Sequence, residues 1–137
     1  MDNIIFKKLW QDGNLLELKI AANSEFATAY QNCYIEDKAL REISEKVIGY
    51  IKNYNTTCYL EFGKKEGDYT PAFSMSILPS DTSGHVKIEV DIEIADNDTR
   101  SHRCSFFVNS ELGLIEQLGK SLKKLVSDPE DTEISLC

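Results

Sequence analysis

Residues 86–94 read VKIEVDIEI, and this short stretch decides what kind of fold the chain forms. Five β-branched residues alternate strictly with Lys87, Glu89, Asp91 and Glu93. Because successive side chains of a β-strand point to opposite faces of its sheet, one face of this strand can enter a hydrophobic core while the other holds a mostly acidic row in water. The stretch therefore predicts an antiparallel sheet with one buried and one solvated face.

The same two-residue period continues on both sides of this strand. Runs rich in turn-forming residues separate the alternating segments, and Asp12-Gly13 between two apolar runs is typical of a hairpin. The pattern predicts further strands over residues 3–10, 15–22, 25–34, 58–62, 73–77 and 103–108.

Two segments have helical periodicity instead. Asp37 is the expected N-cap of a helix over residues 38–53, and Ser110 is the expected N-cap of a final helix. The apolar stripes are Leu40, Ile43, Val47, Ile51 and Tyr54 in the first helix and Ile115, Leu118, Leu122 and Leu125 in the second.

The order βββαββββα predicts an α+β fold. We expect a mainly antiparallel, curved sheet of about six to seven strands, with the two amphipathic helices packed on one face. Residues 1–126 are expected to form a single domain, because 137 residues suffice for one hydrophobic core. Residues 127–137 form an acidic tail with little to bury, which we expect to fray.

Composition narrows the classes of partner. The chain has 23 acidic and 15 basic residues, for a net charge of −8. This charge opposes the phosphates of nucleic acids, so a nucleic-acid partner is not expected, and a basic protein partner is favoured. The sequence contains no apolar run of about 20 residues and no pattern typical of a signal peptide, which predicts a cytoplasmic protein without a membrane segment.

No familiar catalytic or metal-binding motif is present in the sequence, and we expect a non-enzymatic protein without a cofactor. His85 lies many more residues from the centre of the predicted turn between the two strands than His102 does, so the two histidines are not expected to share a site. The carboxylates of the acidic row and of the following turn are not spaced as they are in a calcium-binding loop. The four cysteines contain no C-x-x-C pair and are expected to be free thiols, with Cys58 and Cys104 in the core.

The strand residues that alternate away from the core suggest where a partner binds. Glu61, Glu89, Asp91 and Glu93 are expected on the solvated face, and Tyr59, Phe107 and Trp10 also fall on outward positions. Acidic groups attract a basic partner, and aromatic side chains are common binding hot spots. We therefore predict a partner-binding surface formed by Glu61, Glu89, Asp91, Glu93, Tyr59 and Phe107.

The chain also resembles a known family, the small bacterial immunity proteins of the WapI type, which neutralise a co-encoded polymorphic toxin. The resemblance covers most of residues 3–126. It is carried by LLELKI at residues 15–20, a single helix around residues 40–54, GHVKIEV at residues 84–90 and the closing amphipathic helix. It implies a non-enzymatic protein that presents acidic groups to a basic toxin.

Two other functions remain open at this stage. One is a structural or regulatory domain that self-associates through its sheet, so that the protein is a monomer or a homodimer. The other is a small-ligand binder or an enzyme whose site is assembled from residues far apart in the sequence. A salt-sensitive complex, a concentration-dependent dimer and a pocket of converging titratable groups would distinguish the three.

Overall fold

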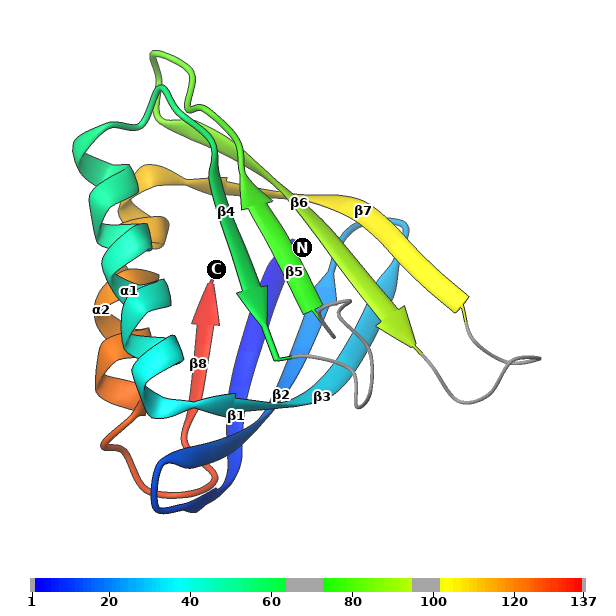
Figure 1. Cartoon of the computed structure of the whole chain (residues 1–137). Coiled ribbons are helices and arrows are strands. Elements are labelled where there is room, and N and C mark those ends of the chain that lie inside the picture. Colours follow the sequence, from blue (N-terminus) through cyan, green and yellow to red (C-terminus); the bar gives the residue numbers. More distant parts are fainter. Residues whose placement is uncertain (1, 64–72, 95–101, 137) are drawn as a thin grey trace.

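The computed structural model describes residues 2–63, 73–94 and 102–136 (Figure 1). The predicted order of strands and helices is confirmed, and one further strand follows it. The elements are β1 (Asn3–Asp12), β2 (Leu15–Asn23), β3 (Thr28–Glu36), α1 (Asp37–Lys52), β4 (Cys58–Phe62), β5 (Phe73–Ile77), β6 (His85–Ile94), β7 (His102–Glu111), α2 (Leu112–Leu125) and β8 (Glu133–Leu136).

The strands form two antiparallel sheets of four, so the prediction of one sheet of six to seven strands is wrong. The strand orders are β3-β2-β1-β8 and β4-β5-β6-β7. Alternation shows that each strand has one buried face, but it does not show which strands share a sheet. Helix α1 separates β3 from β4 in the chain, and β4 begins a second sheet instead of extending the first.

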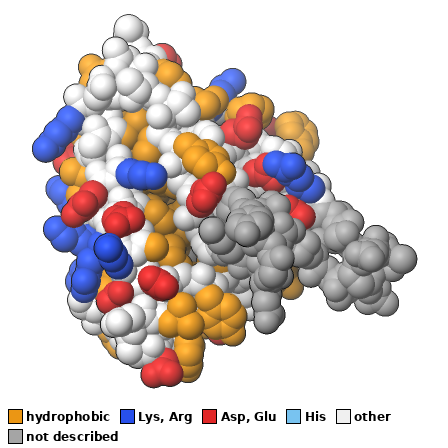
Figure 2. Space-filling view, in the orientation of Figure 1, with side chains coloured by type: hydrophobic (Ala, Val, Ile, Leu, Met, Phe, Trp, Pro, Cys, Tyr) orange, Lys and Arg blue, Asp and Glu red, His pale blue; other side chains and the backbone are white. Residues whose placement is uncertain are grey.

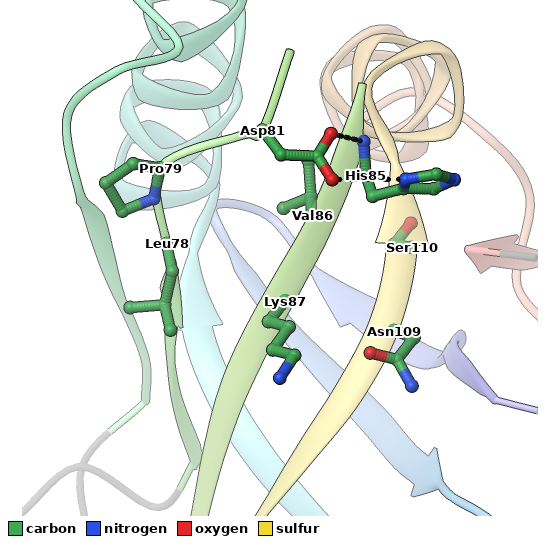
Figure 3. A pocket seen from close by; sticks show the side chains of 8 residues that line it. All are labelled: Leu78, Pro79, Asp81, His85, Val86, Lys87, Asn109 and Ser110. Atoms are coloured by element: carbon green, nitrogen blue, oxygen red, sulfur yellow. Dashed lines mark hydrogen bonds and ion pairs between the residues drawn. The ribbon is translucent and has the colours of Figure 1, made fainter. Parts of the chain in front are cut away.

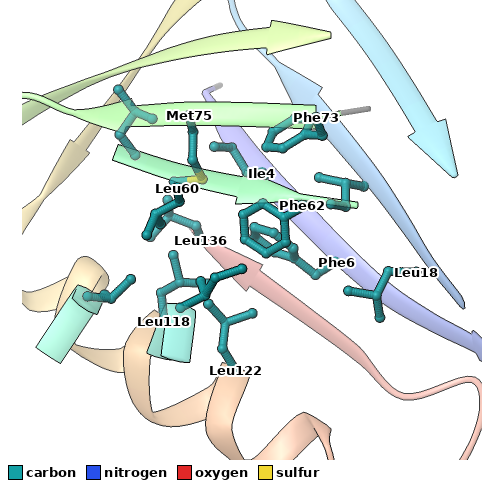
Figure 4. Close-up of a cluster of buried hydrophobic side chains, with 14 of the residues drawn as sticks. Ile4, Phe6, Leu18, Leu60, Phe62, Phe73, Met75, Leu118, Leu122 and Leu136 are labelled. Atoms are coloured by element: carbon teal, nitrogen blue, oxygen red, sulfur yellow. The ribbon is translucent and has the colours of Figure 1, made fainter. Parts of the chain in front are cut away.

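The buried faces of the two sheets meet in one hydrophobic core. The ring of Phe6 in β1 lies 5.4 Å from that of Phe62 in β4, and Phe62 lies 5.8 Å from Phe73 in β5 (Figure 4). The two helices run side by side along one side of the molecule, where α1 contacts β4 and α2 contacts β8 (Figure 1). They therefore close the space between the sheets at two edge strands, instead of covering one face of a single sheet.

Both helices begin differently from the sequence-based prediction. The N-cap positions are Glu36 and Glu111, and neither makes a side-chain capping hydrogen bond. The backbone N–H of Asp37 donates to the carbonyl of Asn14 at 2.8 Å, and that of Leu112 donates to the carbonyl of Gly84 at 3.0 Å. Turns distant in sequence thus supply the acceptors, and Asp37 and Ser110 are not the N-caps.

The C-terminal segment, which we expected to fray, forms strand β8 over Glu133–Leu136. Strand β8 pairs with β1, and Leu136 is only 2% exposed. The backbone N–H of Lys8 donates to the carbonyl of Thr132 at 2.9 Å, and that of Asp131 donates to the carbonyl of Lys8 at 2.7 Å. The acidic composition gave no sign of this pairing because main-chain groups make it.

The side chain of Lys8 also anchors the end of α2. Lys8 is 1% exposed, and its ammonium donates to the carbonyls of Leu125 at 3.2 Å, Val126 at 3.3 Å and Asp128 at 2.6 Å. The last carbonyls of a helix lack partners within the helix and carry partial negative charge, so a cation suits this position. Burial lowers the pKa of Lys8, while the nearby carboxylates of Asp128 and Glu130 oppose that change.

We predict that Lys8→Met lowers the free energy of unfolding by about 2 kcal/mol, because three carbonyls lose a charged donor while the apolar stem stays in place. Urea unfolding followed by circular dichroism measures the effect. Lys7→Met, one residue earlier and less buried, is the control and should change stability by less than about 0.5 kcal/mol. Equal unfolding midpoints for the two variants would contradict the anchoring role.

Candidate partner-binding surface

Strand register brings all six residues of the predicted surface onto the outer face of the β4-β5-β6-β7 sheet. One row across the four strands is Tyr59, Ser76, Glu89 and Phe107, and the next is Glu61, Ser74, Asp91 and Ser105. Glu93 lies one step further along β6, opposite Arg103. We call this set of residues the sheet face.

Aromatic rings stand at both ends of the first row. Tyr59 on edge strand β4 is 49% exposed, and Phe107 on edge strand β7 is 50% exposed. Between them lie the small side chain of Ser76 and the exposed carboxylate of Glu89, which has no ion pair or hydrogen bond within the described part of the chain. The row therefore offers two apolar contacts separated by a negative charge.

The charge of the sheet face is more mixed than the acidic row of β6 indicated. Arg103 Nε donates to both oxygens of Asp91, at 2.8 and 3.0 Å, and Arg103 Nη2 also bonds to Asp91 Oδ2. Lys87 occupies the same face of β6. Among the described residues, four carboxylates thus share this face with two cations, one of which is paired with Asp91.

Tyr59 links the aromatic and acidic parts of the sheet face. Its hydroxyl donates to Glu61 Oε1 at 3.1 Å. Burial raises the pKa of Tyr59, the carboxylate of Glu61 adds to the rise, and a hydrogen bond with Ser74 opposes it. The ring is therefore held in place as a neutral phenol beside a carboxylate.

A hollow of about 360 Å³ continues the sheet face past Phe107 (Figure 3). Its lining residues are Leu78, Pro79, Asp81, His85, Val86, Lys87, Asn109 and Ser110. Asp81 Oδ1 accepts hydrogen bonds from the backbone N–H groups of Ser83 and His85, each at 2.9 Å, and Asp81 Oδ2 lies 3.2 Å from His85 Nδ1. The backbone N–H of His85 is the main cause of the lowered pKa of Asp81, so this carboxylate orders the β5–β6 turn.

The two histidines are separated, as predicted. His85 pairs with Glu111 at one end of the β6–β7 ladder, whereas His102 pairs with Ile94 at the other. Among residues 2–63, 73–94 and 102–136, no three His, Cys, Asp or Glu side chains come close enough to hold a metal ion. Asp96 and Asp98, which follow the acidic row, lie outside the described residues.

The sequence-based prediction missed a second aromatic surface, on the outer face of the β3-β2-β1-β8 sheet. Tyr30 and Tyr34 of β3 are both more than half exposed, and Trp10 contacts Tyr34 edge to face at 6.4 Å between centroids. Lys19 Nζ lies 4.7 Å from the centroid of Tyr30. In the sequence, Tyr30 and Tyr34 fall on the same side of their strand, and this spacing could have indicated the second surface. The outward position predicted for Trp10 is confirmed.

The three cysteines that the structure describes give no sign of a nucleophile. Cys33, Cys58 and Cys104 are free, and burial raises the pKa of Cys33 to about 12. Burial also raises the pKa of Cys58, whose thiol donates to the carbonyl of Lys46 at 3.7 Å. Cys58 and Cys104, which we expected in the core, are only partly buried, although Cys58 packs against the core; Cys33 is the buried core thiol.

A scan against protein-family models and searches of curated proteins and of solved structures found no match to this chain. These comparisons therefore neither support nor oppose the resemblance to WapI-type immunity proteins. Within the described residues, neither helix has the length and apolar character needed to cross a membrane.

Stability should fall at alkaline pH because of Cys33. In the unfolded chain the thiol loses its proton above its ordinary pKa of 9.0, whereas the folded chain keeps it until about pH 12. The folded state then binds more protons than the unfolded state, so the contribution of Cys33 is complete below pH 9 and decreases by about 1.4 kcal/mol per pH unit above it.

Urea unfolding of the wild-type protein and of Cys33→Ala between pH 8 and pH 10.5 measures this contribution. Tyr50 and Cys58, whose pKa values are also raised by burial, add to the decrease in both proteins. The stability difference between the two proteins should therefore shrink as the pH rises. A difference that stays constant across this range would contradict the assignment to Cys33.

Proposed function

We propose that this protein is a non-enzymatic module that binds a basic protein partner through the sheet face. The observation that carries the proposal is the row of Tyr59, Ser76, Glu89 and Phe107, in which two half-exposed rings flank a carboxylate that forms no ion pair with any described residue. Aromatic anchors supply contact area at little entropic cost, and a neighbouring charge selects the sign of the partner.

The charge of the whole chain supports the same partner class. A net charge of −8 speeds the encounter with a basic protein and opposes the encounter with an acidic one. Arg103 neutralises Asp91 and leaves Glu89 as the central charge, which favours a partner with a localised cationic group over a uniformly basic surface.

The specific form of the proposal is an immunity protein that neutralises a co-encoded toxin in the cytoplasm. This form rests on the resemblance to the WapI type. A neutralising protein needs a complementary surface and no catalytic groups of its own. The toxin would then contribute basic residues to the complex, opposite Glu61 and Glu89.

Self-association is the second candidate, and the surface formed by Trp10, Tyr30 and Tyr34 favours it. A dimer formed through this surface would place Tyr30 and Tyr34, on edge strand β3, against a second copy. Its signature is a sedimentation coefficient that rises with protein concentration and that Tyr34→Lys returns to the monomer value.

The primary test is a pull-down with the immobilised protein, using lysate of the source cell and the product of the gene immediately upstream. We expect one stoichiometric basic protein at low salt and its loss at high salt. The double variant E89K/F107A should weaken that complex at least about tenfold, since hot-spot substitutions cost more than about 1.4 kcal/mol.

The matched control reverses one charge away from the sheet face. Glu45→Lys changes an exposed residue of α1 and adds the same charge as Glu89→Lys. A partner that binds the wild-type protein and Glu45→Lys alike, but not E89K/F107A, supports the proposal. Equal binding to all three proteins would show that the sheet face is not the contact surface.

A further inference from the structure

A groove runs between α1 and β4, beside the sheet face. Three neighbouring hollows of about 330, 370 and 450 Å³ share lining residues: Lys46 and Tyr59 belong to the first two, and Ala39 and Glu61 to the last two. They follow one stripe from Ala39 of α1 to the C-cap residue Asn53. Strand β4 supplies the opposite wall of the first two hollows, and residues of β2 and β3 line the third together with Glu61 of β4. In the orientation of Figure 2 the groove faces the viewer, and hydrophobic side chains show along it between charged ones.

The length of the groove matches an extended peptide. The stripe from residue 39 to residue 53 spans about 21 Å at 1.5 Å per helical residue. A fully extended chain advances about 3.3 Å per residue, so about six residues cover this distance. The buried side chains of Ile43 and Tyr50 supply part of an apolar floor.

The charges along the groove are mainly negative. Among the described residues, Glu36, Glu42 and Glu61 line it together with one cation, Lys46. Within the residues that the structure describes, Glu36 and Glu42 form no ion pair, although Glu42 and Lys46 stand one helical turn apart. Unpaired carboxylates beside an apolar floor are complementary to a cationic, extended segment.

Gly49 gives an independent indication that the groove is kept open. It lines the first hollow in the last turn of α1, where glycine is a weaker helix former than alanine. A Cβ atom added at this position would meet nothing within 4 Å, so packing does not require glycine there. At this position glycine therefore leaves the first hollow without an obstructing side chain.

From these observations we propose that the groove binds an extended, lysine- or arginine-rich segment of about six residues from the partner. This inference deepens the proposed function and rests on it, because Tyr59 and Glu61 belong both to the groove and to the sheet face. Cationic side chains of the segment lie near Glu42 and Glu61, and apolar ones between them occupy the hollows.

The test uses a capped, fluorescein-labelled hexapeptide that alternates arginine with valine, and its counterpart with glutamate in place of arginine. Fluorescence anisotropy measures the dissociation constants. We expect the basic peptide to bind the wild-type protein and the acidic peptide not to bind. E42Q/E61Q should weaken the basic peptide about tenfold, whereas E45Q/E116Q, with the same loss of charge elsewhere on the helices, should change the constant less than twofold.

A second variant leaves the charge unchanged. Gly49→Gln places a side chain in the first hollow without a clash and should also weaken the basic peptide at least fivefold, with an unfolding midpoint no lower than that of the wild type. Equal dissociation constants for the wild-type protein, E42Q/E61Q and Gly49→Gln would overturn the proposal, as would equal binding of the two peptides.

The failure of this inference is distinguishable from failure of the proposed function. If the partner complex survives E42Q/E61Q and Gly49→Gln but is lost in E89K/F107A, the groove is not used while the sheet face is. If E89K/F107A leaves the complex intact and Gly49→Gln, which leaves the sheet face unchanged, abolishes it, the groove is the primary site and the proposed sheet-face contact is wrong.

Discussion

The rest of the structure depends on the burial of two sheet faces against each other. Each four-stranded sheet has one apolar face, and neither can remove that face from water alone. Phe6, Phe62 and Phe73 join the sheets ring to ring, and the helices close the side that the sheets leave open. Because both inner faces are used in this way, the outer faces of the sheets and the hollows beside the helices are described surfaces that stay open to contact with other molecules.

The sequence predicted the individual strands and helices well because their information is local. Strict alternation from Val86 to Ile94 placed Glu89, Asp91 and Glu93 outward, and antiparallel pairing of neighbouring strands then brought Tyr59, Glu61 and Phe107 onto the same face. The alternation of residues along each strand and the order of the strands in the chain were sufficient to predict that these residues share one face.

The features that the sequence did not predict depend on contacts between distant segments. The chain forms two sheets because β4 pairs with β5 instead of joining the first sheet. At the start of each helix, a main-chain carbonyl of Asn14 or Gly84 accepts a hydrogen bond from the first helical N–H group. Main-chain groups are the same for every residue, so they leave no pattern to read. The charge of the sheet face was misjudged for a related reason, since Arg103 reaches Asp91 from the neighbouring strand.

The pairing of β8 with β1 has a consequence for how the chain folds during synthesis. Strand β1 leaves the ribosome first among the elements, but its partner on one side consists of residues 133–136. The ammonium of Lys8 likewise waits for carbonyls more than a hundred residues later. Such contacts close late and slow folding. Until residues 133–136 have been synthesised, β1 has a bare edge that can pair with other chains.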